Sequence, residues 1–343
     1  MNIDLDKLNW QKLVALYAKA DMRQAIWQLI NTVIPFIALW GVMLWTVTST
    51  SPRIPYWATL LLAIPTAGFM VRTFIIFHDC CHGSFFKSKR ANEVVGSALG
   101  VLTFTPFYEW RHAHAIHHAT AGNIDKRNVG DVPTMTVQEY LAAPWYTRVG
   151  YRIMRQPLIL FTVGSAIMFL VVHRFPPKHS ERRERLSVHL TNLGLLVLFG
   201  GLMLLFGWKA VLSVLLPVAI LASAAGVWLF YVQHQFEGVY WETKDRWSFV
   251  RAGMQGSSFY KLPRVLQWFT GNIGFHHIHH LSPKIPNYRL EQCFRATPAF
   301  QIRPLGILHS LKGVRLHLID DATRQLVGWE ALRKYRTGQQ PAK

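Results

Sequence analysis

The sequence predicts an all-α integral membrane protein: four transmembrane helices in two hairpins, further interfacial or re-entrant helices, and a cytosolic helical cap. Three observations support this fold class. The chain of 343 residues is 51% hydrophobic, which is too apolar for an ordinary soluble enzyme. Several apolar stretches approach the length of about 20 residues that a helix needs to cross a bilayer. The formal charge is +19, and the basic residues lie in loops beside these stretches. Positive cytoplasmic loops of a membrane protein explain this pattern, so we expect no nucleic-acid partner.

The first element of the chain is polar and amphipathic. Residues 1–25 carry acidic side chains and no apolar core, which argues against a signal peptide and favours a helix on the membrane surface. Six apolar segments follow, at 26–48, 55–77, 93–107, 156–173, 187–206 and 210–232. The stretch 93–107 is too short to span a bilayer, so we expect it to be interfacial.

The segment 156–173 contains Pro157 and is marginal in length. Basic residues flank both of its ends, in 148–155 and in the loop 173–186. Both ends should therefore stay in the cytoplasm, and we expect this segment to be re-entrant or interfacial. The four remaining segments form two hairpins, 26–48 with 55–77 and 187–206 with 210–232.

This topology places both termini and every histidine cluster on the cytoplasmic side. Only three cysteines occur, too few for a disulfide framework, and they fit a reducing compartment: Cys80, Cys81 and Cys293. We expect three parts in the chain: an interfacial segment 1–25, a membrane domain 26–300 and a cytosolic tail 301–343 that forms a small cap element.

Nine histidines form three clusters and one single position. The stretch "FHDCCHGS" (77–84) contains His78 and His82, four residues apart and therefore on one helix face. The stretches "WRHAHAIHH" (110–118) and "GNIGFHHIHH" (271–280) each contain H-x-x-H-H, which can direct imidazoles to two neighbouring metal ions. The first pattern consists of His114, His117 and His118, and the second of His276, His279 and His280. The single position, after the fourth span, is His234.

The number and type of ligands narrow the choice of metal. Zinc usually stops at four ligands, and calcium and magnesium prefer oxygen. Copper fits the imidazoles, but no thiolate or methionine joins the clusters. Two iron ions with four or five imidazoles each fit the count and leave room for water or dioxygen. Carboxylates that could orient the imidazoles are Asp79, Glu109, Asp125, Asp131 and Glu237.

The other histidines do not follow the spacing of the clusters. We expect His112 and His277 to lie beside the ligands without binding metal. Five more are expected at the surface or the membrane interface: His173, His179, His189, His309 and His317.

At these residues the sequence resembles the membrane fatty acid desaturases, a family with three histidine boxes around a non-haem di-iron centre. The boxes here read "HDCCH" (78–82), "HAIHH" (114–118) and "HHIHH" (276–280). The resemblance covers roughly residues 25–300. It extends to bacterial acyl-lipid desaturases of the Bacillus delta-5 type, through "FIIFHDCCH" (74–82), "GVWLFYVQHQFE" (226–237), "GSSFYKLP" (256–263) and "GNIGFHHIHHLSPKIPNY" (271–288).

The resemblance implies a four-helix membrane stem with a cytosolic cap that carries the di-iron site. It implies one iron on His78, His114, His118 and His279, and a second on His82, His117, His234, His276 and His280. Phe230 stands where some animal relatives have an asparagine that contacts the metal through water. The chain contains no cytochrome b5 sequence, so a separate electron donor is implied, ferredoxin or flavodoxin.

The implied reaction removes two hydrogens from adjacent methylenes of a phospholipid acyl chain. An alkane C–H is not acidic, so acid–base side chains cannot remove it, whereas a metal centre supplied with dioxygen and two electrons can. Candidate residues for an acyl tunnel, which core packing explains equally well, are Phe74, Phe77, Trp110, Trp228 and Tyr231.

Two other functions stay open. A membrane di-iron hydroxylase of alkyl or acyl chains would share the H-x-x-H-H boxes. A non-catalytic metal-binding membrane protein is disfavoured, because transport predicts ionisable groups inside the spans and these spans are nearly free of charge. The expected location is a bacterial cytoplasmic membrane, with the active site facing the cytoplasm. The sequence leaves open the double-bond position, and lipid-linked substrate as opposed to acyl-CoA or acyl carrier protein.

Overall fold

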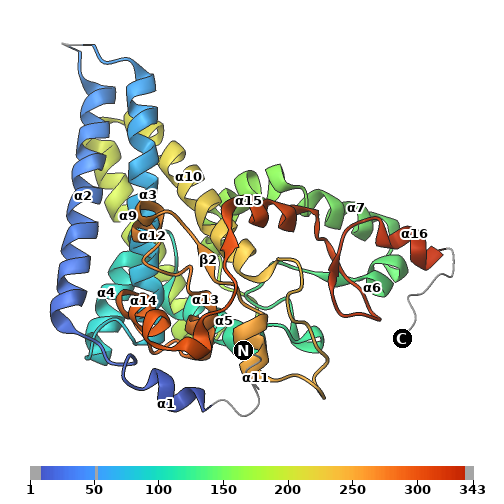
Figure 1. Cartoon of the computed structure of the whole chain (residues 1–343). Helices are drawn as coiled ribbons and strands as arrows, with labels where there is room; N and C mark the ends of the chain where they lie inside the picture. Colours follow the sequence, from blue (N-terminus) through green and yellow to red (C-terminus); the bar gives the residue numbers. More distant parts are fainter. Residues whose placement is uncertain (1–8, 51–52, 337–343) are drawn as a thin grey trace.

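The computed structural model describes residues 9–50 and 53–336 and consists mainly of helices. Four of the described helices are long and apolar enough to cross a membrane. They are α2 (Met22–Thr48), α3 (Tyr56–His82), α9 (Arg182–Phe206) and α10 (Trp208–His234). They form the stem in Figure 1, and shorter elements form a cap at one end. The predicted fold class, with four spans in two hairpins, is confirmed.

The first hairpin pairs α2 with α3. Asp21 caps the start of α2 by accepting the backbone N–H groups of Arg23 and Gln24. Between the helices, the hydroxyls of Thr46 and Thr59 lie 2.8 Å apart and satisfy each other inside an apolar interface. Gly83 ends α3 in the left-handed conformation, with φ of 64°. The second span therefore runs on through "HDCCH", so this box belongs to a membrane helix.

The second hairpin pairs α9 with α10, and only α10 is central. Gly207, with φ of 81°, makes the turn between them. Helix α10 packs against α3 through a shared core that includes Ala63, Val214 and Val218. Helix α9 leaves most of its apolar surface exposed, which suits a helix that faces lipid.

The segment predicted to be re-entrant or interfacial is bent. It follows α7 (Trp145–Met154) and contains a π-helix, Ile159–Gly164, then α8 (Ser165–Leu170) and a 3₁₀ turn, Val172–Arg174. The two halves, Trp145–Met154 and Ile159–Arg174, meet at 76°, so they do not form one straight span. The short stretch predicted to be interfacial becomes α4 (Lys89–Leu102), which has 14 residues.

The cap combines short helices with two small sheets. Its helices are α5 (Phe107–Thr120), α6 (Val137–Ala142), α11 (Phe249–Gln255), α12 (Arg264–Phe269), α13 (His276–Leu281), α14 (Asn287–Ala296), α15 (Ile307–Ser310) and α16 (Ala331–Arg336). One sheet has the order β1 (Met135–Thr136), β4 (Leu318–Ile319) and β5 (Leu326–Val327), with β1 parallel and β5 antiparallel to β4. The other pairs β2 (Tyr260–Lys261) in parallel with β3 (Leu305–Gly306).

Near the N-terminus, the structure shows a short helix, α1 (Trp10–Val14), rather than one long amphipathic helix. Val14 is buried in the cap core with Ile278 and Leu281, and Leu16 is exposed. Part of the predicted interfacial segment therefore packs on the cap, while residues 1–8 lie outside the described residues.

One prediction for the remaining histidines is wrong. His317 is buried, with its ring stacked on Trp329 at 4.5 Å between centroids, because the C-terminal sheet folds over it. His173 is half-buried, and His179, His189 and His309 are exposed, as expected.

Candidate metal centre

Four helices bring the nine predicted histidines together. The last turn of α3 carries His78 and His82, and the last residue of α10 is His234. The other six come from the cap helices α5 and α13: His114, His117, His118, His276, His279 and His280. Eight of the nine are buried and His82 is half-buried. All nine lie in one region, at the cap end of the stem.

The nine imidazoles divide into two groups whose ligand nitrogens lie within 4.8 Å of one another. Group one consists of His78, His82, His114, His118 and His279. Group two consists of His117, His234, His276 and His280.

The division follows helical spacing. In each box the two histidines four residues apart share a group: His78 with His82, His114 with His118, and His276 with His280. The middle histidine of each H-x-x-H-H lies in the other group, so one helical turn contributes imidazoles to both groups. The structure corrects one assignment implied by the resemblance. His82 lies in group one, 4.7 Å from His78 and 4.9 Å from His279 between ring centroids, and not in group two.

The Nε2 atoms within each group face one another. In group two, Nε2 of His234 lies 3.2 Å from that of His117 and 3.0 Å from that of His276. In group one, Nε2 of His118 lies 3.1 Å from that of His114 and 3.0 Å from that of His279. Two nitrogens bound at right angles to one ion, each at about 2.1 Å, would lie about 3 Å apart. The donor set therefore fits two metal ions.

The Nδ1 atoms of three ligands point outward to acceptors. His78 donates to Asp79 at 3.1 Å, and His117 donates to Asp131 at 2.5 Å. His234 donates to the Gly256 carbonyl at 3.1 Å. Such contacts place the hydrogen on Nδ1 and leave the Nε2 lone pair free for a metal. Of the five candidate carboxylates, Asp79 and Asp131 thus contact the imidazoles.

The other candidate carboxylates lie elsewhere. Asp125 accepts the backbone N–H of Lys244, and Glu237 lies 3.8 Å from His309. Glu109 is turned toward Glu184, and burial together with that neighbour raises its pKa.

The two neighbouring histidines of the boxes also lie outside both groups. The exposed His112 pairs with Glu184 at 3.3 Å, and the buried His277 donates to the Phe300 carbonyl at 2.8 Å.

Two polar residues that sequence reasoning missed support Asp79. Its Oδ2 accepts the backbone N–H of Asn287 at 2.6 Å and the side-chain amide of Asn287 at 2.9 Å. Asn287 Oδ1 in turn accepts from Gln28 at 2.8 Å. All three are buried, so this chain of bonds ties α2 and α14 to the first histidine box. The available signals were an asparagine, Asn287, directly after Pro286 at the start of α14 and a glutamine, Gln28, within an apolar span.

Five histidines of the cap are held neutral. Burial, followed by the neighbouring imidazoles, lowers the pKa values of His114, His118, His276, His279 and His280 well below the usual value. An imidazole binds a metal only in its neutral form, so this environment favours binding at neutral pH.

Comparison with known proteins agrees with this geometry. A model of the family "Fatty acid desaturase" matches residues 54–307, which contain all nine histidines. The chain belongs to the fatty acid desaturase family. A fatty acid desaturase of Bacillus subtilis (strain 168) is 45% identical over 323 residues, covering 94% of this chain and 90% of the relative.

More distant relatives have more specific names. An sn-1 oleoyl-lipid 12-desaturase of Synechocystis sp. is 28% identical, over 69% of this chain and 67% of its own length. An sn-1 acyl-lipid omega-3 desaturase (ferredoxin) of the same organism is 29% identical, over 68% of this chain and 64% of its own length.

Aromatic rings of this desaturase enclose group one. Trp110 stacks on His114 with 4.2 Å between ring centroids. Phe74 contacts Trp110 at 5.4 Å, and Phe169 of the bent segment contacts Phe74 at 5.9 Å. Phe77 also contacts Trp110, at 5.3 Å. Three of the candidate tunnel residues, Phe74, Phe77 and Trp110, are therefore packed between the bent segment and the metal ligands.

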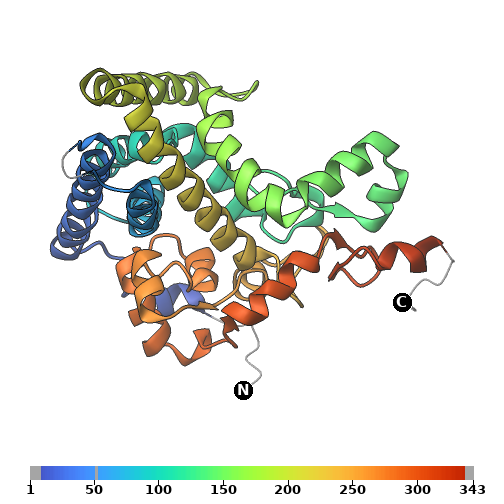
Figure 2. The same cartoon turned by 90° about the horizontal axis from the view of Figure 1, so that it is seen from above.

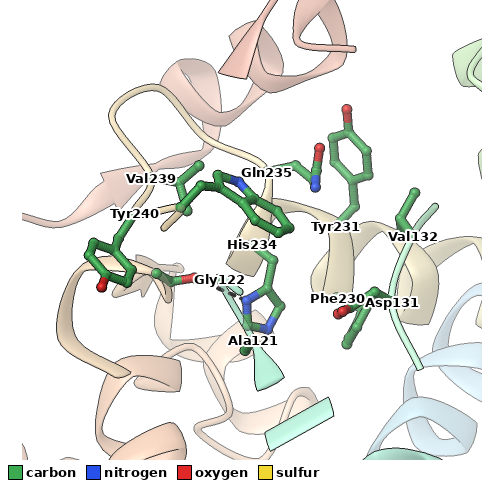
Figure 3. Close-up of a pocket in the computed structure, with 12 residues that line it drawn as sticks. Ala121, Gly122, Asp131, Val132, Phe230, Tyr231, His234, Gln235, Val239 and Tyr240 are labelled. Carbon is green, nitrogen blue, oxygen red and sulfur yellow. Dashed lines mark hydrogen bonds between the residues drawn. The ribbon is translucent and has the colours of Figure 1, made fainter. Parts of the chain in front are cut away.

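The aromatic residues around group two come from other parts of the chain than those around group one. Phe230 lies 5.1 Å from His117 and 5.3 Å from His234 between ring centroids. The other two candidate tunnel residues, Trp228 and Tyr231, pack on Phe161. Figure 3 shows a small pocket beside His234, also lined by Asp131, Phe230, Gln235 and Tyr240.

Proposed function

We propose that this protein is an acyl-lipid desaturase that introduces a cis double bond into acyl chains of membrane phospholipids, with dioxygen and two electrons. The observation that carries the proposal is the pair of histidine groups, whose Nε2 atoms converge at 3.0–3.2 Å inside each group. The reaction belongs to the oxygen-dependent oxidoreductases. The metal would be iron, because nine imidazoles without thiolates exceed what zinc binds.

Group one would hold one iron through five imidazoles, and group two would hold the other through four. When bound, such a pair supplies the oxidising power, drawn from dioxygen and two electrons, to remove hydrogens from unactivated methylenes. Burial keeps five imidazoles of the cap neutral, and Asp79 and Asp131 keep the rings of His78 and His117 in place. The aromatic rings beside His114 and His117 exclude water and shape the space for an acyl chain.

The membrane position supports a lipid-linked substrate. The first histidine box ends a span, and His234 ends another, so the ligands lie where the stem meets the cap. Acyl chains of membrane lipids can reach that depth from the side, and two of the relatives are named for acyl-lipid or oleoyl-lipid substrates. Positive loops favour a bacterial cytoplasmic membrane with the site toward the cytoplasm.

The electron donor would be a separate ferredoxin or flavodoxin. The names of two relatives include ferredoxin. Such donors are acidic, and the formal charge of +19 on this chain would attract them.

The proposal can be tested by expressing the chain with a ferredoxin and its reductase in a bacterial host. Phospholipid acyl chains are then analysed by mass spectrometry with double-bond localisation, which also gives the position of desaturation. We expect new cis double bonds that disappear in the membrane-inserted His117→Ala variant. A hydroxylated product without a new double bond would favour a hydroxylase. Iron-loaded protein with neither product would point to a non-catalytic metal-binding role.

A further inference from the structure

Three short cap elements expose apolar side chains at one level of the molecule. They are α7, α12 and α15. Figure 1 shows α7 and α15 lying across the long axis of α2 and α3, level with the lower part of α10, with α12 near the same level. In Figure 2, α7 and α15 lie on either side of the end of α10. The three elements are separated by up to 160 positions in the sequence, yet they share this level.

Helix α7 is amphipathic. Tyr151 faces the cap, where its hydroxyl donates to the His317 carbonyl. The opposite stripe has the helical spacing of Trp145, Val149 and Ile153, and all three are exposed, Trp145 by 70%. The chain then continues into the apolar bent segment, Ile159–Arg174. This stripe is therefore continuous with a part of the chain that belongs in lipid.

The second element, α15, lies in the C-terminal part of the chain. Leu308 is 83% exposed, and Ile307 and Leu311 are exposed beside it. Lys312 follows Leu311 directly, Arg315 follows three residues later, and both are exposed, so basic side chains lie next to the apolar ones. This combination suits the boundary between acyl chains and phosphate groups.

Helix α15 is firmly attached to the stem. Its preceding strand β3 pairs with β2 through Tyr260 and Leu305. The Tyr260 hydroxyl also accepts from Trp228 Nε1 of α10, at 3.3 Å, and from Ser310 Oγ, at 3.3 Å. The level of α15 is thus set by the fourth span.

Helix α12 is attached to the second span in a similar way. Arg72 of α3 places its guanidinium 3.9 Å from the ring centroid of Trp268 and donates to the Trp268 carbonyl. Val265 remains 68% exposed, and Leu266 is exposed beside it. Helices α12 and α15 are therefore bonded to spans, α7 continues into the bent segment, and all three leave large apolar side chains exposed in the described part of the chain.

We infer that α7, α12 and α15 form an interfacial belt that lies in the headgroup region of the bilayer, around the end of α10. The occupant is the lipid surface, because the apolar stripe of α7 continues into the bent segment and the other two elements are bonded to spans. The segment 305–315 is then part of the membrane anchor and does not belong to a free cytosolic tail. The belt concerns the position of the chain in a membrane and does not depend on the chemistry proposed above.

The belt also has a consequence for access to the metal centre. His234 ends α10, and Trp228 of the same helix is bonded to the belt through Tyr260. Contact of α15 with lipid would therefore hold the end of α10, with His234, close to the membrane surface.

The test uses the full-length protein in nanodiscs of phosphatidylglycerol and phosphatidylethanolamine, sized for one copy. Single cysteines replace exposed residues, as Leu308→Cys, Trp145→Cys and Val265→Cys, while the native cysteines are buried and stay in place. The control is Asp245→Cys, at a side chain that is 72% exposed on a polar loop. The rate of reaction with a water-soluble maleimide is measured for each.

We expect all three belt positions to react about tenfold more slowly than the control, because lipid contact withdraws apolar side chains from water. The position Leu308→Cys decides the inference for the C-terminal segment. Reaction there at the control rate would overturn it and leave α15 open to a soluble partner instead. Slow reaction cannot come from a second protein, because each disc holds one copy.

Discussion

The position of His82 depends on the helix that carries it. It follows His78 by four residues in the last turn of α3, so both rings lie on one face and enter the same group. The same spacing explains why His114 pairs with His118. A ligand assignment taken from a resemblance had placed His82 with group two, against this helical rule.

Removal of His82 should therefore affect one metal ion. We expect one of the two iron ions in His82→Ala to be lost more readily to a chelator, followed by elemental analysis of the purified protein, because group one falls from five imidazoles to four and group two keeps all four. The double variant His78→Ala/His82→Ala should weaken the same ion further and leave the other unchanged, whereas His82→Ala/His117→Ala should weaken both. If His82→Ala/His117→Ala kept one ion as firmly as the unaltered protein, His82 would belong to group two. His309→Ala is the control and should keep both ions.

Asp131 orients one ring of group two. The variant Asp131→Asn keeps the shape of the side chain but loses the charged oxygen that accepts the Nδ1 hydrogen of His117, with 2.5 Å between Nδ1 and Oδ1. We expect about 10- to 100-fold weaker iron retention against a chelator, with the helical circular dichroism unchanged. Asp125→Asn is the matched control, since that carboxylate accepts a backbone N–H of Lys244. Equal retention in both variants would contradict an orienting role for Asp131.

At the scale of elements, Arg155 joins four segments beside group two. It ends α7 and is buried. It donates to the carbonyls of Leu316, at 2.7 Å, and Pro133, at 3.4 Å. It also donates to the Gln235 side chain, at 3.1 Å, next to His234. These bonds hold the end of α10, the loop after Asp131 and the C-terminal sheet in one arrangement.

Replacing Arg155 should loosen that junction. In Arg155→Leu the buried side-chain oxygen of Gln235 loses its donor, so we expect the protein to lose about 2 kcal/mol of stability. Thermal unfolding in detergent measures the effect. Arg152→Ala is the control, because Arg152 is exposed and its loss should cost about 1 kcal/mol or less. A smaller effect at Arg155 than at Arg152 would show that the junction does not depend on the guanidinium.

Expectations for whole elements succeeded where composition decides the structure. The four spans, and the position of His78 and His82 at the end of the second one, followed from runs of apolar residues and from helical spacing. The short helix α1 and the burial of His317 did not, because each depends on contacts with distant segments. Val14, for example, is buried only because α13 supplies Ile278 and Leu281.

At the scale of the whole molecule, charge and topology act together. The chain is strongly basic, and Lys284 lies beside the half-buried ligand His82, where its ammonium donates to the His82 carbonyl at 2.8 Å. An acidic electron donor would be attracted to this face.

Ionic strength should therefore slow turnover with ferredoxin but not turnover driven by dithionite, a small reductant. We expect the ferredoxin-dependent rate to fall about tenfold when salt shortens the range of electrostatic attraction. Lys284→Glu should raise the KM for ferredoxin, and Lys244→Glu, an exposed cation in another loop, serves as the control. Equal effects of the two substitutions would place the donor elsewhere.

The sequence by itself determined the class of the protein and the set of nine imidazoles. The length of an apolar run, the charge of a loop and a spacing of three or four residues are local properties of the sequence. Each of them determines a structural feature without contacts to distant parts of the chain. Only the tertiary structure decided which carboxylates orient the rings and which residues support them. Asp79 meets Asn287 across 208 positions, because the packing of α3 against α14 brings them together. Such contacts depend on how whole elements pack, and no local pattern in the sequence encodes them.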